Sequence, residues 1–223
     1  MTTRLHALLA TLAFLAAGVG AAADRDGLWR IVESCLDSGA ADYCTACPAP
    51  SVESGCAATG SCLATTEVWA INKDYVAIRD AKACGCPADF VHGLALPRER
   101  VTGVEDARRP EGLWQFAWSA AEVRIRDRTS IALIVNPRTW RTQDQLHIHI
   151  LRLRNDARAH LAPKAGHLPL LASTWARAAE MASVASLGDN YGILVMLNPA
   201  GGGYLLHVDV TPLEHLYALA WCK

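Results

Sequence analysis

The segment Arg141-Thr-Gln-Asp-Gln-Leu-His-Ile-His-Ile150 alternates polar and apolar side chains over its second half, which is the pattern of a β-strand. Successive side chains of a strand point to opposite faces, so one face carries the polar residues Gln145, His147 and His149. The other face carries Leu146, Ile148 and Ile150. We expect the apolar face to pack into the core and the two imidazoles to lie side by side on the opposite face.

Two imidazoles at positions i and i+2 can act on one phosphate, one as nucleophile or base and the other as donor to the developing charge. The loop before them supplies the donors that such an anionic group needs: Asn136, Arg138, Arg141 and Thr142. The loop arginines could instead be solvated turn residues, and a His-x-His pair is also a common pair of metal ligands. The sequence therefore indicates a phosphate site, with His147 and His149 as its catalytic residues.

Further strands are expected on both sides of this segment. β-Branched and aromatic runs predict strands at 67–71, 75–79, 91–96, 130–135, 143–151, 191–197 and 204–210, with turn signals at 72–74 and 198–203. Apolar residues at helical spacing predict helices at 110–126 and 173–186, the second beginning at a Ser-Thr cap. Strands joined by hairpins, with two helices between groups of strands, predict an α+β domain that has an antiparallel sheet and flanking helices.

The first 23 residues have the pattern of an export signal. Arg4 precedes an uncharged apolar run, residues 7–23, that ends in small residues; this predicts a signal peptide, with an uncleaved membrane anchor as the alternative. The rest of the chain, residues 24–223, is expected outside the cytoplasm as one domain. The whole chain has 21 basic and 22 acidic residues, and residues 1–23 hold Arg4 alone among them, so the body has 20 and 22, a formal charge of −2. This balance predicts no association with nucleic acid.

All cysteines follow the signal segment, at positions 35, 44, 47, 56, 62, 84, 86 and 222. Their even number in an exported chain predicts disulfides, which would stabilise the cysteine-rich segment 35–86 and hold the C-terminus through Cys222. A zinc site is the alternative, because Cys44 and Cys47 have ligand spacing and Cys84 and Cys86 could supply two more sulfurs.

The stretch Val135-Asn-Pro-Arg-Thr-Trp-Arg-Thr-Gln-Asp-Gln-Leu-His-Ile-His-Ile150 resembles the active-site region of the histidine-triad superfamily, and its first half resembles the CDP-diacylglycerol diphosphatase (pyrophosphatase) family in particular. Similar segments occur in the same order at 27–32 with Cys35, 76–80, 96–105, 191–193 and Cys222. The resemblance implies a histidine-triad-like fold and a hydrolase that cleaves CDP-diacylglycerol to CMP and phosphatidate without a metal or other cofactor. It also implies phospholipid metabolism in the periplasm, or at the periplasmic face of the inner membrane.

The same resemblance assigns roles to the residues. His147 would attack the phosphorus next to the nucleoside and form a nucleotidyl-histidine, and His149 would stabilise charge around that phosphorus. Thr142 falls where the superfamily places a hydroxyl on phosphate, and Arg141 replaces a glutamine of many relatives. Gln145 stands at the first triad position, where a histidine is usual; its amide can bond a backbone or ring partner but cannot carry a charge. Asn136 and Arg138 complete the expected substrate-binding residues.

Other functions stay open at this stage. The chain could hydrolyse another nucleoside diphosphate ester, or it could be a secreted protein that binds a nucleotide or lipid without catalysis. It could also be a metal enzyme in which His207 joins His147 and His149. The remaining histidines are expected to be surface or hydrogen-bonded core residues: His92, His160, His167 and His215. The expected partners are the lipid substrate and a membrane surface, with a homodimer among the assemblies considered.

Overall fold

Eight strands form one antiparallel sheet in the computed structural model, which describes residues 24–34, 36, 67–80, 83, 86–87 and 89–222. The strands are β1 Val68–Ile71, β2 Tyr75–Arg79, β3 His92–Pro97, β4 Ile131–Val135, β5 Ile148–Arg152, β6 Gly166–Leu168, β7 Gly192–Leu197 and β8 Tyr204–Asp209. Their order across the sheet is β1-β2-β3-β5-β4-β7-β8-β6. The helices are α1 Gly27–Ser34, α2 Gly112–Arg124, α3 Ala157–Leu161, α4 Thr174–Val184 and α5 Leu213–Tyr217. The predicted α+β class with an antiparallel sheet is confirmed.

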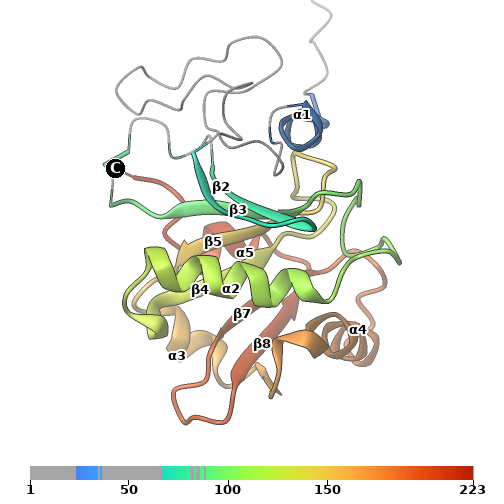
Figure 1. The fold of residues 1–223 in the computed structure, drawn as a ribbon. Helices are drawn as coiled ribbons and strands as arrows, with labels where there is room; N and C mark the ends of the chain where they lie inside the picture. Colours follow the sequence, from blue (N-terminus) through green and yellow to red (C-terminus); the bar gives the residue numbers. More distant parts are fainter. Residues whose placement is uncertain are drawn as a thin grey trace, which may run out of the picture.

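One face of the sheet, which we call the apolar face, carries Leu133, Ile148 and Ile150. The helices α2 and α4 cover it, and α2 lies across the front of the sheet in Figure 1. Their buried aromatic residues pack there; the rings of Trp114 and Trp175 meet edge to face at a centroid separation of 5.0 Å. This continuous core confirms that the apolar side chains of residues 146–150 face inward.

The opposite face, which we call the histidine face, carries Leu94, Ile134 and His149, because directly paired strand residues point the same way. Two separate hydrophobic clusters lie on it. The first packs α1 against β2 and β3, and the second packs α3 and α5 against β4, β5 and β7. The imidazole of His149 lies between these two clusters, among buried polar side chains.

The strand that carries the histidines is shorter than predicted. β5 begins at Ile148, whereas the sequence predicted a strand from residue 143. Before Ile148 the backbone bonds to loops instead of a neighbouring strand: Asp144 N donates to Arg25 O, and Leu146 N donates to Val101 O. Residues 143–147 therefore form no ladder with a neighbouring strand, although Gln145, His147 and His149 are all buried.

The other predicted elements are present within a few residues of their expected limits. The helix predicted at 173–186 is α4, but Ser173 does not cap it through its side chain. Its hydroxyl donates to Leu170 O instead, because a 3-10 turn at Leu171–Ser173 precedes the helix. Helices α1, α3 and α5 and the short strand β6 were not predicted from the sequence.

Cys86 and Cys222 form a disulfide, which confirms that a bridge holds the end of the chain. The other predicted disulfide cysteines, the alternative Cys44–Cys47 zinc site and the predicted signal segment 1–23 lie outside the described residues. In the part of the chain that the structure describes, no helix combines the length and the apolar character that crossing a bilayer requires.

Candidate active site

His147 lies immediately before β5 and lines a small cavity together with Asn136 and Arg141. Its Nδ1 lies 2.7 Å from the backbone oxygen of Gln145. A carbonyl oxygen only accepts hydrogen bonds, so Nδ1 carries the proton and, in the neutral ring, Nε2 bears the lone pair. The backbone of the histidine's own segment thereby fixes the tautomer that a nucleophilic imidazole needs.

His149 lies beside His147 on the histidine face, with ring centroids 4.8 Å apart. Both of its ring nitrogens have buried neighbours. Nδ1 lies 3.2 Å from His92 Nε2, and Nε2 lies 3.4 Å from both Asn136 Nδ2 and Glu214 Oε2. The predicted pair of imidazoles is therefore adjacent, and the second imidazole belongs to a polar network that was not predicted from the sequence.

That network contains two buried carboxylates. Asp80 Oδ2 lies 2.9 Å from His92 Nε2, and Glu214 Oε1 lies 3.6 Å from the same nitrogen. Asn136 Nδ2 donates to Glu214 Oε2 at 2.8 Å. His92 was predicted to be a surface or hydrogen-bonded core residue, and it is a hydrogen-bonded core residue with no exposed surface. Its partners are distant in sequence, so spacing gave no signal for Asp80 or Glu214.

Within the described residues, Asp80, His92 and His149 form a group whose potential ligand atoms all lie within 4.8 Å of one another, so they could hold a metal ion. This differs from the metal site considered from the sequence, in which His207 was the third ligand. The register places His207 three strands from His149, through Ile134 and Leu194, which is about 14 Å at the usual strand spacing. The predicted metal site with His207 as a ligand is therefore wrong, because His207 lies too far from His149. Burial lowers the pKa of His207.

The side-chain amide of Gln145, at the first triad position, bonds to backbone groups of the loop after β3. Its Nε2 donates to Pro97 O at 2.9 Å and to Glu99 O at 2.8 Å, and its Oε1 accepts from Val101 N at 3.4 Å. The amide thus fixes the loop after β3, which leads directly into Thr102 and Gly103 at the cavity. A neutral imidazole has one N–H and could not make both donor contacts.

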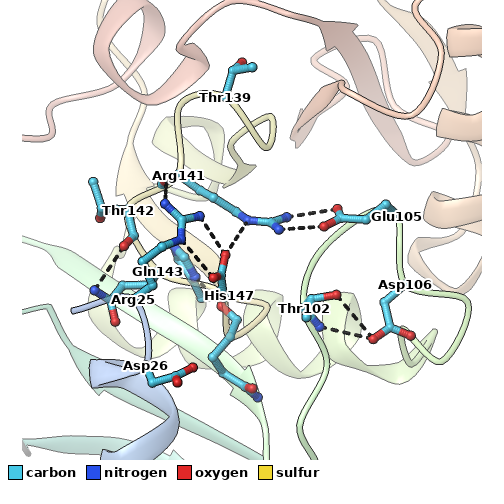
Figure 2. A network of polar contacts seen from close by, with 12 residues as sticks. Arg25, Asp26, Thr102, Glu105, Asp106, Thr139, Arg141, Thr142, Gln143 and His147 are labelled. Atoms are coloured by element: carbon cyan, nitrogen blue, oxygen red, sulfur yellow. Dashed lines mark hydrogen bonds and ion pairs between the residues drawn. The ribbon is translucent and has the colours of Figure 1, made fainter. Parts of the chain in front are cut away.

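Arg141 reaches the cavity from the loop before β5, and its side chain is 9% exposed. Two hydrogen bonds of 2.9 and 2.6 Å join it to Glu105, as Figure 2 shows. Burial by itself would raise the pKa of Glu105, but the hydrogen bonds and charge of Arg141 hold that pKa below its ordinary value. The Arg141 Nε lies 3.5 Å from Asp144 and forms no hydrogen bond with the described residues.

The other predicted phosphate ligands lie farther out. The side chain of Arg138 is 52% exposed and faces Asp189 at 3.7 Å, and Thr142 is exposed. The structure therefore brings together Asn136, Arg141, Gln145, His147 and His149, whereas Arg138 and Thr142 lie on the surface.

These features define an antiparallel α+β protein with paired imidazoles beside a cavity that an arginine lines, an arrangement suited to hydrolysis at phosphorus. The family of CDP-diacylglycerol pyrophosphatase matches residues 23–184, and the chain belongs to this family. It is therefore a phosphoanhydride hydrolase, and the family implies CDP-diacylglycerol as its substrate. The match contains every predicted site residue, whereas Glu214 lies beyond it.

Proposed function

We propose that the chain hydrolyses CDP-diacylglycerol through a covalent intermediate on His147, by the chemistry of the histidine-triad superfamily. The observation that carries this proposal is the bond from His147 Nδ1 to Gln145 O, which leaves the lone pair on Nε2. A ring held in this way can attack phosphorus without first losing a proton.

The reaction has two displacements. In the first, His147 Nε2 attacks the phosphorus of the cytidylyl group, a P–N bond forms, and the phosphoanhydride P–O bond breaks to release phosphatidate. In the second, water attacks the same phosphorus, the P–N bond breaks, and CMP leaves with the hydroxyl oxygen while His147 is restored. Together, the two easier displacements replace one difficult displacement by water.

Arg141 and Asn136 are placed to bind the diphosphate, because both line the cavity beside His147. The guanidinium is already oriented by Glu105, so little side-chain freedom is lost when an anion binds. Arg138 lies at the exposed end of the same loop, where it could attract the substrate but would make a smaller contribution than Arg141.

We propose further that the chain works outside the cytoplasm beside a membrane. The disulfide between Cys86 and Cys222 supports an oxidising compartment, and the pattern of residues 1–23 supports export. A lipid substrate requires access to a bilayer surface. This part of the proposal concerns location alone and is independent of the covalent step.

The test is a substrate comparison with the full chain in detergent micelles. CDP-diacylglycerol should give CMP and phosphatidate in equal amounts, faster than CDP-choline or a dinucleoside diphosphate gives its products. Substitution His147→Ala should abolish turnover, while the thermal unfolding midpoint stays close to that of the wild type. Preference for a soluble diphosphate would overturn the lipid specificity, and turnover retained by His147→Ala would overturn the nucleophile.

A further inference from the structure

Residues 24–28, which we call the N-terminal strap, bond to the loop before β5. Gln143 Nε2 donates to Asp24 O at 2.8 Å, and Leu28 N donates to Gln143 Oε1 at 2.9 Å. The second bond satisfies one of the N–H groups that the first turn of α1 leaves open. Bonds to the strap therefore take the place of the β-ladder bonds that this loop lacks.

Arg25 connects the strap to Asp144 through both backbone and side chain. Asp144 N donates to Arg25 O at 2.8 Å. The guanidinium of Arg25 donates to both carboxylate oxygens of Asp144, from Nε at 2.8 Å and from Nη2 at 2.6 Å. Two parallel bonds of this kind fix the orientation of both groups, which a single charge contact does not. The pKa of Asp144 lies below its ordinary value, chiefly because Arg25 donates to its carboxylate.

The same carboxylate lies beside Arg141. Asp144 Oδ1 is 3.5 Å from Arg141 Nε, while Glu105 binds the two terminal nitrogens of that guanidinium. Arg25 Nη1 also donates to Arg141 O at 3.4 Å. Figure 2 shows Arg25, Arg141 and Glu105 in one network of polar contacts. A guanidinium held from two sides has little freedom to lose when it binds a diphosphate.

Burial increases along this network towards the cavity. The side chain of Arg25 is 45% exposed, that of Asp144 34% and that of Arg141 9%. Exposed ion pairs usually contribute little to the stability of a fold, so the loss of Arg25 should affect the site more than the fold. Without Arg25, the carboxylate of Asp144 would attract Arg141 more strongly, and its charge would oppose the binding of a diphosphate.

We propose that Arg25 is a positioning residue for the diphosphate of the substrate: through Asp144 it sets the position of the Arg141 guanidinium at the cavity. This inference rests on the proposed function, in which Arg141 binds the diphosphate, and deepens it. Arg25 follows the predicted export segment, residues 1–23, by two positions. The first residues of the predicted exported body thereby support the active site.

The first test separates substrate binding from a loss of folded protein. Arg25→Gln should raise KM for CDP-diacylglycerol about 10-fold while kcat falls less than about threefold, because Arg141 binds the diphosphate before and during the reaction. Partial unfolding would instead lower kcat at constant KM. Arg30→Gln is the matched control, since Arg30 is 44% exposed and pairs with Asp24, and it should leave both constants unchanged. An unchanged KM in Arg25→Gln, or an equal rise in Arg30→Gln, would overturn the proposal.

The second test asks whether Arg25 acts through Asp144 and Arg141. Asp144→Asn should raise KM by a similar factor, and the double variant with Arg25→Gln should be no worse than either single variant. In a chain that carries Arg141→Gln, adding Arg25→Gln should change KM less than about twofold. A further rise of about 10-fold in that background would mean that Arg25 acts independently of Arg141, contrary to the proposal.

The third test needs no turnover. Calorimetric titration with inorganic pyrophosphate should show binding by the wild-type chain, weaker by about 10-fold in Arg25→Gln and unchanged in Arg30→Gln. Equal affinity in the wild type and Arg25→Gln, or no binding by the wild type, would overturn the proposal. If the wild type turns over no CDP-lipid but this difference in pyrophosphate affinity is found, the proposed function fails and the positioning of Arg141 by Arg25 stands.

Discussion

The two faces of the sheet differ in the side chains that they bury. The apolar face is one continuous cluster under α2 and α4, whereas the histidine face has two clusters divided by a buried polar group that contains His92, His149 and Glu214. Both faces bury apolar side chains, but only the histidine face also buries a group of polar side chains whose nitrogens and oxygens need partners. The polar side chains of the candidate site are therefore concentrated on one side of β5, and the largest apolar cluster lies on the other.

The largest change in stability is expected on the apolar face. Substitution Trp114→Ala removes a fully buried ring from α2 and should destabilise the fold by about 3–5 kcal/mol. Urea unfolding would measure it, and kcat of the folded fraction should be unchanged. Val123→Ala is the control on the same helix, since Val123 is 75% exposed, and it should change stability by less than about 0.5 kcal/mol. A large loss of kcat in folded Trp114→Ala would contradict the view that the apolar face contributes to stability and not to activity.

A smaller effect, confined to activity, is expected at Gly103. A Cβ there would lie 2.0 Å from Arg141 Nη1, so Gly103→Ala must displace the guanidinium, which is the flexible end of its side chain. We expect kcat/KM to fall about 100-fold with a modest change in unfolding midpoint. Arg138→Gln tests the exposed arginine of the same loop and should lower kcat/KM less than threefold. Equal losses in the two variants would contradict the distinction between the buried and the exposed arginine.

The smallest effect concerns acid stability. The pKa of Glu105 is lowered in the folded chain. As the pH falls, the Glu105 carboxylate is therefore protonated in the unfolded chain before it is protonated in the folded chain. The contribution of the pair with Arg141 is therefore complete above the unfolded value of about 4.3 and is lost as the pH drops through the folded value. Urea midpoints of the wild type and Glu105→Gln should differ by a constant amount from pH 5 to 8 and converge as the pH falls through the lowered folded-state pKa. A difference that changes between pH 5 and 8 would contradict this origin.

The sequence predicted the apolar face and most strands well, because alternation and β-branched runs report burial on one side of a strand. It placed His147 and His149 together for the same reason. It overextended β5, since the residues before Ile148 are bonded to Arg25 and Val101, and such long-range bonds leave no local pattern.

The polar half of the site was less accessible to sequence reasoning. His92, Asp80 and Glu214 come from three distant parts of the chain and meet only because β3, β5 and α5 are adjacent in the fold. A lone histidine on a strand carries no sign of such neighbours. Conversely, Arg138 and Thr142 had the right chemistry for phosphate, but local loop geometry turns them to the surface.

The central claim is that His147 becomes covalently nucleotidylated, and rapid acid-free quenching followed by peptide mass spectrometry tests it most directly. Wild-type chain mixed with CDP-diacylglycerol and quenched in alkaline denaturant, where phosphoramidates persist, should yield a peptide containing His147 that is heavier by the mass of CMP less water. The adduct should appear before steady state and be absent from His147→Ala. Steady turnover by the wild type with no adduct, or with an adduct on another residue, would contradict the account.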